Sequence, residues 1–380
     1  MVLHQKLNFI GTINRQYDDS FARTGAKIGD SLKIRLPNQY TVRTGATRSN
    51  QDTTESSVTL QVATMKGVDF SFDSQEWTMS LDDFSDRVLE PAMSVLAANI
   101  EADALSMYKD VANIVDGDAA SLSLLHILNG GKALTENLAP TAKRSALLSP
   151  AHTVKLVDAL KGLFQDSDAI AKQYREGIIW RTAGFDFYQN TLVTDHTTGT
   201  AAKTTGYLSN GATQSGATIA VDTGSTTFKK GDVITFAGVN AVHPETKVSL
   251  GYLKQFAIAA DYAGGAGNIS ITPALVATGA TQNASSTIAD NSAIVKVGAG
   301  ASELLNSSLL YYRDAFTFAT ADLIMPKGTH MAAREVMDGI SMRFVSDFSI
   351  SDGSFPCRID VLYGYKAIRP ELACRLHADA

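Results

Sequence analysis

The chain has 380 residues, of which 44% are hydrophobic and 19% charged, and its 33 basic and 39 acidic residues give a formal net charge of −6. This length is enough for two or three domains with sizeable cores. The negative charge excludes a nucleic-acid binder that acts through bulk positive charge, and the hydrophobic fraction excludes a largely disordered chain. Two cysteines, Cys357 and Cys374, are too few for a disulfide framework or a zinc site.

Membrane and export segments are not expected. No apolar run approaches the length of about 18 residues that a membrane-spanning helix needs. The opening residues, MVLHQKLNFIGTINRQ, lack the apolar stretch of a signal peptide. We therefore expect a soluble protein of a reducing cytosol that makes no membrane contact.

Residues 1–31 show no clean hydrophobic period, and we expect an N-terminal arm there. Residues 32–79 are predicted to form a β ribbon, because apolar and polar residues alternate on both sides of a polar stretch. The alternating apolar residues are Leu32, Ile34 and Leu36, then Val58, Leu60 and Val62. An isolated two-stranded ribbon is marginal in water, and so long a loop is unusual inside a compact domain. This extended loop is therefore predicted to lie on something else.

Residues 80–115 are predicted to hold a long spine helix that ends near Asp110. Ser80 and Asp83 fit a start of the capping-box kind, with acidic residues that favour the positive end of the helix dipole. Apolar residues follow at roughly helical spacing. Pro91 lies inside this pattern, so we expect it to kink or divide the helix.

Two segments, 116–192 and 301–380, are expected to form an α+β core. Helical patterns at 121–138 and 150–163 surround the short strand RSALLS, and 178–192 has the pattern of β structure. These segments alternate helix and strand, as expected of a mixed domain rather than an all-α one.

The C-terminal segment FPCRIDVLYGYKAIRPELACRL is expected to form one or two long strands. Gly364 should bend them, and Pro370 should mark an edge or a turn. The preceding run, LLYYRDAFTFA, is dense in aromatic residues.

Residues 193–300 differ from the rest of the chain in composition. They hold six Lys, no Arg, six Asp or Glu, and 14 of the 29 glycines. Short alternating runs such as DVITFAGV and NISITPAL are separated by turn residues at about the spacing of a small sandwich or barrel. We predict an all-β domain that is inserted into the host at an exposed loop whose ends lie close together.

The sequence offers no coherent catalytic, cofactor or metal site. It has no P-loop and no nucleophile-elbow motif, and no two of its seven histidines fall at metal-ligand spacing. The acidic residues Asp82, Asp83 and Asp86 are better explained as charges at a helix N-terminus, and Cys357 as a small buried side chain. We expect no enzyme activity and no cofactor, and a role in assembly.

Charged residues on the extended loop and near the C-terminus are the candidates for subunit contacts. On the loop these are Arg35, Arg43, Arg48, Asp52 and Glu55, and near the C-terminus they are Arg369 and Glu371. The basic residues of the loop could contact phosphate, but carboxylates of a partner subunit or solvent are the more ordinary partners of exposed arginines.

Several segments resemble major capsid proteins of tailed bacteriophages, of the short-tailed, lambdoid podovirus coat type. LLYYRDAFTFATADLIMP and DGSFPCRIDVLYGYKAIRPELACRL resemble the last third of that family. There an arginine, an aromatic–glycine pair and an Arg-Pro-Glu run follow in order, here Arg358, Tyr363-Gly364 and Arg369-Pro370-Glu371. REGIIWRTAGFDFYQNT resembles the segment before the family's inserted domain, and FKKGDVITFAGV resembles a strand pair within that domain.

The resemblance implies the capsid fold of tailed phages, with an arm, an extended loop, a spine helix, peripheral and axial domains, and an inserted β-barrel domain. It implies a protein that assembles with itself, as hexamers and pentamers, into an icosahedral shell around double-stranded DNA. A precursor shell would form first and expand on maturation. The other partners would be a scaffolding protein, a portal protein and DNA held weakly at the inner surface. The location would be the virion capsid and, during assembly, the host cytoplasm.

This chain departs from the family pattern in two places. In the family, a charged loop near the start of the inserted domain pairs with a neighbour, whereas residues 204–221 contain no charge. Some relatives crosslink neighbouring subunits through a lysine on the extended loop, whereas residues 34–65 contain no lysine. That salt bridge is therefore not carried over, and we expect no autocatalytic crosslinking of that kind.

Other functions stay open from the sequence. The shell of a bacterial nanocompartment would share the fold and package an enzyme, but is not expected to carry so large a β insert. A phage tail or adhesin protein would explain the Gly- and Thr-rich β segment, but not the long helix. An enzyme of another class is the third alternative, weakened by the lack of a coherent site.

Overall fold

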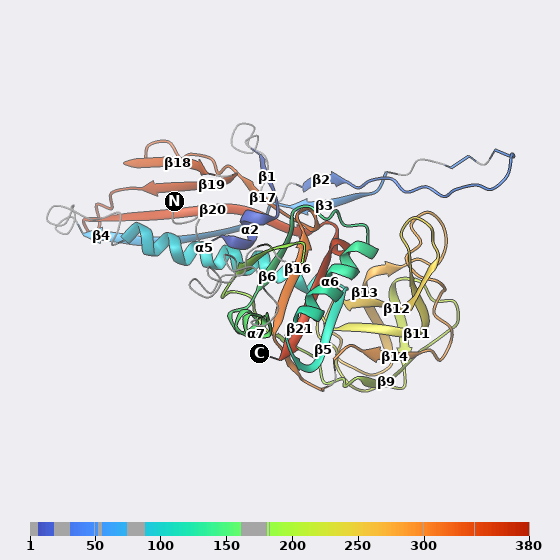
Figure 1. The fold of residues 1–380 in the computed structure, drawn as a ribbon. Coiled ribbons are helices and arrows are strands. Elements are labelled where there is room, and N and C mark those ends of the chain that lie inside the picture. Colours follow the sequence, from blue (N-terminus) through green and yellow to red (C-terminus); the bar gives the residue numbers. More distant parts are fainter. Residues whose placement is uncertain are drawn as a thin grey trace, which may run out of the picture. The chain divides into compact units, whose positions relative to one another are not determined.

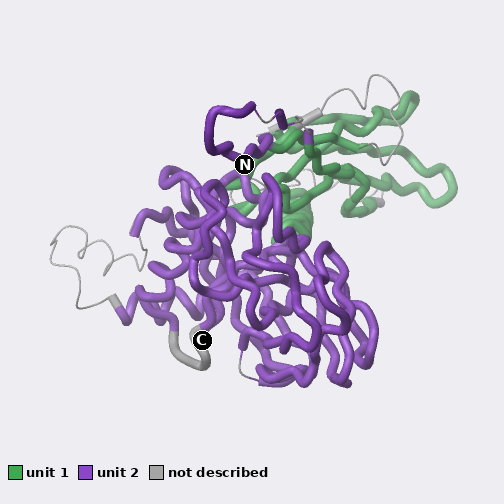
Figure 2. The backbone as a smooth tube through the Cα atoms, turned by 90° about the vertical axis from the view of Figure 1, so that its right-hand side faces the viewer, with its two compact units in different colours: residues 1–36, 56–106, 316–368 green, residues 37–55, 107–315, 369–380 purple. Residues whose placement is uncertain are grey.

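The computed structural model describes residues 7–18, 31–48, 50–51, 55–73, 88–160, 181, 183–298, 300–337 and 339–379. The chain divides into two compact units (Figures 1 and 2). The first unit consists of Met1–Leu36, Ser56–Ser106 and Phe316–Ile368, and the second of Pro37–Glu55, Met107–Ala315 and Arg369–Ala380. Both units are therefore built from segments that lie far apart in the sequence.

A six-stranded sheet forms most of the first unit. Its strands are β1 (Asn14–Asp18), β17 (Phe316–Ala321), β20 (Ser354–Ala367), β19 (Ile340–Ser346), β18 (Met331–Met337) and β4 (Thr64–Asp73). They run in the order β1-β17-β20-β19-β18, with β4 also paired to β20. Only β1 and β17 pair in parallel. The fourteen residues of β20 thus hold the sheet together, because this strand contacts β17, β19 and β4.

Helix α5 (Glu90–Leu105) packs with β4 and with the short helix α2 (Asn8–Thr12) in the same unit. Its buried residues include Leu96, Ile100 and Ala104, four residues apart on one face. Pro91 lies in the first turn of α5, directly after residues 88–89, which are π-helical, so the helical geometry changes at this point of the chain. Residues 80–87, the part of the expected helix before Pro91, lie outside the described residues.

The expected spine helix can be compared with the structure at its C-terminal end. There a 3-10 turn, η2 (Ser106–Asp110), follows α5, and strand β5 (Ile114–Ser121) comes next. Helical structure therefore ends near Asp110, as predicted. Residues 74–87, which contain the expected start at Ser80, lie outside the described residues.

The root of the ribbon is the antiparallel pair β2 (Ser31–Arg35) and β3 (Ser57–Gln61). Leu32 lies opposite Leu60, and Ile34 opposite Val58. The apolar face of this pair packs on Ala319, Ala321 and Leu362 of the sheet. The alternation of apolar residues in both segments is the cause, because it places every apolar side chain of the pair on one face.

Gly364 lies within β20, which runs unbroken from Ser354 to Ala367. Its role in this strand is a close approach. A Cβ at this position would lie 3.0 Å from the Cα of Val62, and nearer still to the carbonyl oxygen of Gln61. Only glycine lets the backbone of β3 and the residues after it come so near to β20. The glycine therefore seats the ribbon root.

A five-stranded sheet forms the core of the second unit. It consists of β5, β21 (Ala373–Asp379), β16 (Ser307–Tyr312), β6 (Arg144–Leu148) and β7 (Phe185–Gln189), in that order. Helix α6 (Leu124–Glu136) packs against β21, β16 and β5 and contacts α7 (Pro150–Leu160). The side chain of His126 bonds back to Ser123 and closes a capping box at the start of α6. The turn expected at Pro370 is the short 3-10 helix η4 (Pro370–Leu372).

The insert is a closed six-stranded barrel within the second unit, in the order β10-β13-β12-β11-β14-β9 (Figure 1). Its strands are β9 (Thr204–Ser209), β10 (Gly216–Asp222), β11 (Val233–Val242), β12 (Ser249–Ile258), β13 (Gly267–Leu275) and β14 (Ala293–Lys296). All of its strand pairs are antiparallel. The interior is filled by buried side chains such as Phe236 and Phe256, whose rings meet edge to face. The all-β character predicted for this segment is confirmed.

Candidate assembly surfaces

The segment that joins β2 to β3, residues 37–55, is here called the ribbon tip. The side chain of Gln51 closes it: the Thr41 N–H donates to the Gln51 Oε1 over 2.8 Å, and the Gln51 Nε2 donates to the Thr41 carbonyl over 2.5 Å. Val42, which follows Thr41, is 96% exposed. Tyr40, which precedes Thr41, is also exposed. Val42 and Tyr40 are therefore available for an apolar contact with another molecule.

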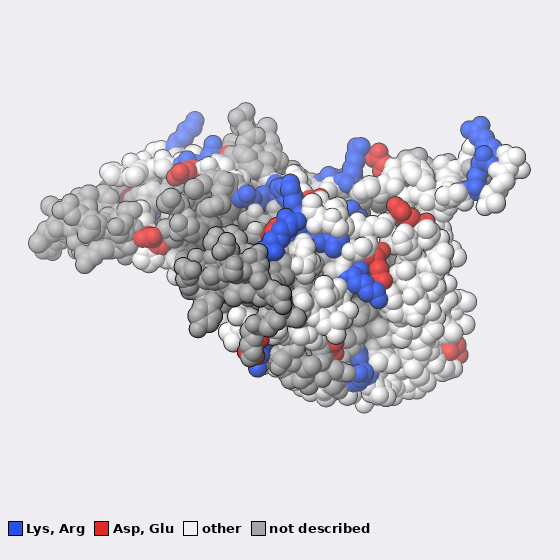
Figure 3. All heavy atoms as spheres, in the orientation of Figure 1, with Lys and Arg blue, Asp and Glu red and all other residues white. Residues whose placement is uncertain are grey.

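Basic residues of the tip bond only to the tip among the residues described. The Arg43 guanidinium donates to the carbonyl oxygens of Gly45 and Thr47, and the Arg48 Nε donates to the Asn50 Oδ1 over 2.6 Å. Figure 3 shows basic side chains, drawn in blue, over this segment. Both arginines therefore keep a positive charge that no carboxylate of the described chain neutralises.

The other candidates on the loop are placed as follows. Arg35 is the exposed last residue of β2, and Glu55 is exposed just before β3. Asp52 lies outside the described residues. On the ribbon root, Lys33 and Arg35 are exposed while Leu32 and Ile34 face the sheet. The ribbon root thus has one face that packs on the sheet of its own chain and one face with exposed basic side chains.

Arg369 and Glu371 are brought together by η4. The Arg369 Nε lies 2.9 Å from the Glu371 Oε1, and both side chains are partly exposed. The backbone around them is fixed as well, since the Asn113 amide donates to the carbonyl oxygens of Glu371 and Ala373. These two charges satisfy each other within the chain, which makes them weaker candidates for a contact with a neighbour than Arg43 and Arg48.

The first unit carries a groove of about 730 Å³ on its sheet. Its lining combines apolar side chains with charged ones. The apolar members are Phe70, Pro326, Val345, Pro356 and Cys357, and the charged ones are Asp69, Arg343, Asp347 and Arg358. Asp69 is 74% exposed and lies 3.6 Å from the Arg358 Nε, while Arg343 is held by the buried Asp360. The groove therefore keeps exposed carboxylate at its rim.

Hydrogen bonds from side chains to backbone groups join the barrel to the core sheet. The Ile114 N–H of β5 donates to the Gln255 Oε1 over 2.8 Å, and the Gln255 Nε2 donates to the Ile114 carbonyl over 3.0 Å. Val233 and Ala257 of the barrel pack with Ile114 in one buried cluster. The Arg375 Nη1 of β21 donates to the Gly231 carbonyl over 2.7 Å. The insert is thus a bonded part of the second unit rather than a tethered appendage.

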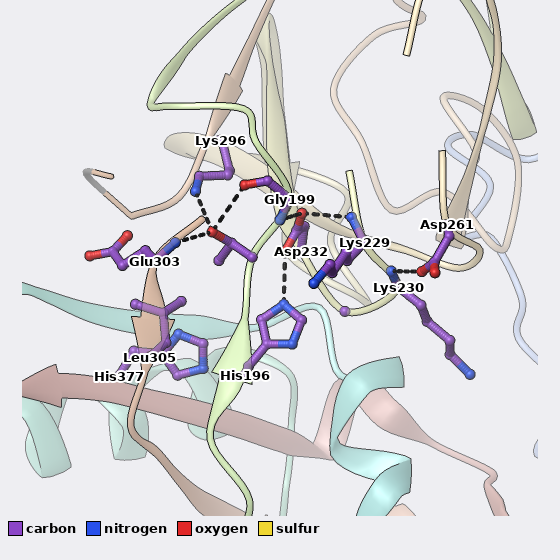
Figure 4. Close-up of polar contacts among 12 residues, drawn as sticks. His196, Gly199, Lys229, Lys230, Asp232, Asp261, Lys296, Glu303, Leu305 and His377 are labelled. Carbon is purple, nitrogen blue, oxygen red and sulfur yellow. Dashed lines mark hydrogen bonds and ion pairs between the residues drawn. The ribbon is translucent and has the colours of Figure 1, made fainter. Parts of the chain in front are cut away.

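A buried polar cluster at this junction was not expected from the sequence. The His196 Nε2 lies 2.8 Å from the Asp232 Oδ1, and the N–H groups of Gly199 and Lys229 donate to the other carboxylate oxygen (Figure 4). The Lys296 Nζ donates to the Thr198 Oγ1 and the Gly300 carbonyl. Residues so distant in sequence carry no local pattern that marks them as partners.

Several of the side chains with shifted pKa values are buried. Burial raises the pKa of the Cys374 thiol to about 12, and burial lowers the pKa of the Arg375 guanidinium to about 10. Burial and the hydrogen bond to Asp103 raise the pKa of the Tyr363 hydroxyl. Within the described ranges, no three His, Cys, Asp or Glu side chains are placed to hold a metal ion. Across those same ranges, no helix is both long and apolar enough to cross a membrane.

Comparison with solved structures finds phage proteins at low identity. A structure from Mycobacterium phage Che8 has 12% identity and a TM-score of 0.49, over 95% of this chain and 88% of that one. The mature capsid of bacteriophage PhiM1 has 10% identity and a TM-score of 0.47, over 96% and 85%. The capsid of Ralstonia phage GP4 has 9% identity and a TM-score of 0.44, over 97% and 88%. No curated protein sequence matches the chain.

The decisive comparison is with a model of one protein family, described as "P22 coat protein - gene protein 5", which matches residues 16–376. The match runs from β1 through the barrel to β21, so it includes both units and the insert. It agrees with the α+β capsid fold and the inserted β domain that the sequence resemblance implied. The chain belongs to the P22 coat protein family.

Proposed function

We propose that copies of this major capsid protein close into an icosahedral shell, through contacts in which the ribbon tip of one copy lies on a neighbour. The proposal is supported by the family match over residues 16–376 and by the ribbon tip, which exposes Val42 and carries two arginines that pair with no carboxylate among the described residues. Hexamers and pentamers would be the units of the shell. Because symmetry repeats each contact many times, modest free energy at one contact is enough.

The groove of the first unit is the surface we propose for the tip of a neighbouring copy. Its lining offers apolar side chains for Val42 and two carboxylates, Asp69 and Asp347, for the arginines of the tip, beside its own Arg343 and Arg358. Pairing of unlike charges across such a contact favours correct pairing and rejects like charges. Weak single contacts of this kind also let wrongly added subunits dissociate before the shell closes.

The shell would hold double-stranded DNA and touch it weakly. A net charge of −6 suits an inner wall that does not grip phosphate, since tight binding would hinder packing and ejection. A scaffolding protein and a portal protein would guide assembly in the host cytoplasm. A precursor shell would then expand as arm, spine and ribbon repack. The barrel would add stability or set curvature and would catalyse nothing.

Deletion of residues 40–55 tests the proposal. We expect the variant to fold, with the circular dichroism and urea midpoint of the parent, because the ribbon root and both sheets lie outside the deletion. We expect few or no closed shells by negative-stain electron microscopy. A second variant that replaces residues 40–55 with a Gly-Ser linker of equal length separates the chemistry of the tip from its length. Normal shells from both variants would overturn the role of the ribbon.

A further inference from the structure

The insert leaves the core sheet through a short stem, defined here as β8 (His196–Thr197) and β15 (Leu304–Leu305). The two strands pair antiparallel, with His196 opposite Leu305. The Thr198 N–H donates to the Glu303 carbonyl over 2.9 Å, and the Ser302 N–H donates to the Gly199 carbonyl over 2.8 Å. The two chain segments that connect the barrel to the core sheet therefore form one hydrogen-bonded element.

Buried charges hold the barrel end of the stem. Asp232, only 2% exposed, accepts hydrogen bonds from the His196 Nε2, the Gly199 N–H and the Lys229 N–H over 2.8, 3.0 and 2.9 Å (Figure 4). The fully buried Lys296 donates to the Thr198 Oγ1 over 3.1 Å. Each charge has close partners, so this end is stable as long as the stem stays closed.

The core end of the stem meets His377 of β21, which is 1% exposed. Its Nε2 lies 3.2 Å from the Ser307 Oγ, and its Nδ1 has no hydrogen-bond partner among the residues described. A protonated imidazole donates from both nitrogens. Protonated His377 would therefore bury one unpaired N–H together with a positive charge, two residues from the buried Arg375.

A second histidine, His152 of α7, is equally enclosed. Its Nδ1 lies 2.6 Å from the Ser308 Oγ, and its Nε2 lies 3.1 Å from the Ala378 carbonyl. Burial lowers the pKa of both histidines, and Arg375, His196 and His152 lower that of His377 further. The other titratable or charged groups that face this cluster are Tyr108, Asp110, Asp116, His126, Asp195, Asp232, Lys296, Glu303 and Cys374.

We propose that the stem is an acid-sensitive latch, which holds the barrel on the core sheet at neutral pH and opens when His377 takes up a proton. The direction of the pH dependence follows from the difference in proton binding between the closed and the open stem. In the closed stem His377 resists protonation, whereas in the open stem it is protonated near its ordinary pKa of about 6.5. Opening therefore binds a proton, so the closed form is favoured above about pH 6.5 and is lost progressively below it. The inference does not depend on how copies assemble.

Hydrogen exchange of the full-length chain between pH 5 and 8 tests the latch. The readout is the protection factor, corrected for the intrinsic exchange rate, of the Thr198 and Ser302 amides. We expect protection to fall about tenfold for each pH unit below 6.5, as one proton bound on opening requires. His377→Gln should remove this dependence of protection on pH. If His377→Gln does not fold, His377→Asn replaces it in the same measurement. His330→Gln, which changes an exposed histidine, should behave as the parent does.

Three results would overturn the latch. Protection of the stem amides in the parent that does not change with pH would show that no proton is linked to opening. A His377 variant whose protection falls in parallel with the parent would place the linked proton elsewhere. An equal fall in the protection factor of the Leu362 amide, in the first unit, would show global acid unfolding instead of an opening confined to the stem.

Discussion

Replacing Gly364 with alanine should displace the ribbon root from the sheet of the first unit. The new Cβ would lie 3.0 Å from the Val62 Cα and closer still to the Gln61 carbonyl oxygen. Both atoms belong to the backbone, so no side chain can rotate away, and β3 must move off β20. Overpacking of this kind typically costs about 1–3 kcal/mol. The cluster of Leu60, Val62 and Leu362 should loosen with it.

Urea unfolding of the Gly364→Ala monomer measures this cost, and light scattering follows its assembly. We expect a lower urea midpoint and slower growth of large particles, because the ribbon is no longer aimed by its root. Gly11→Ala is the matched control: nothing lies within 4 Å of a Cβ there, and alanine in helix α2 should be neutral or stabilising by about 0.5–1 kcal/mol. A Gly364→Ala variant that unfolds and assembles as the parent does would refute the close seating of the ribbon.

Three further changes follow from buried contacts. Glu101→Gln should destabilise the chain to urea by about 1–3 kcal/mol, because the buried carboxylate accepts the Phe9 and Ile10 N–H groups; the exposed Glu90→Gln should not, and equal midpoints would refute this anchor. Gln255→Ala should cost a similar amount, since it removes both bonds to Ile114; an unchanged midpoint would argue against the barrel–core pairing. Cys374 should resist thiol reagents at pH 8 until urea is added, because burial raises its pKa to about 12; rapid native labelling would contradict that burial.

Local patterns predicted the parts of the fold that depend on local geometry. The alternation from Leu32 to Leu36 and from Val58 to Val62 places every apolar side chain of the ribbon root on one face, and the observed register pairs Leu32 with Leu60. The change in composition at residues 193–300 likewise indicated an all-β insert, because glycine-rich turns between short alternating runs favour antiparallel strands.

Positions that depend on distant contacts were misjudged or missed. Gly364 was expected to bend a strand, but its reason is the approach of Gln61, three hundred residues away in sequence. The histidines were judged one at a time by spacing, whereas His196 bonds to Asp232 of the barrel and His377 to Ser307 of β16, both distant in sequence.

The charged residues named as candidates for subunit contacts also fall into two groups. The guanidinium of Arg43 and that of Arg48 are open to a partner, as their positions in a polar loop indicated. Arg369 and Glu371 were proposed from the resemblance, but their spacing of two residues across a proline turn already allows the internal pair that forms.

The most direct test of assembly is negative-stain electron microscopy of the purified full-length protein, with size-exclusion light scattering of the same sample. We expect closed shells or large rings, tens of nanometres across, either alone or when a scaffolding protein is co-expressed. Protein that stays a monomer of 40.5 kDa at high concentration, with the scaffold present, would contradict it.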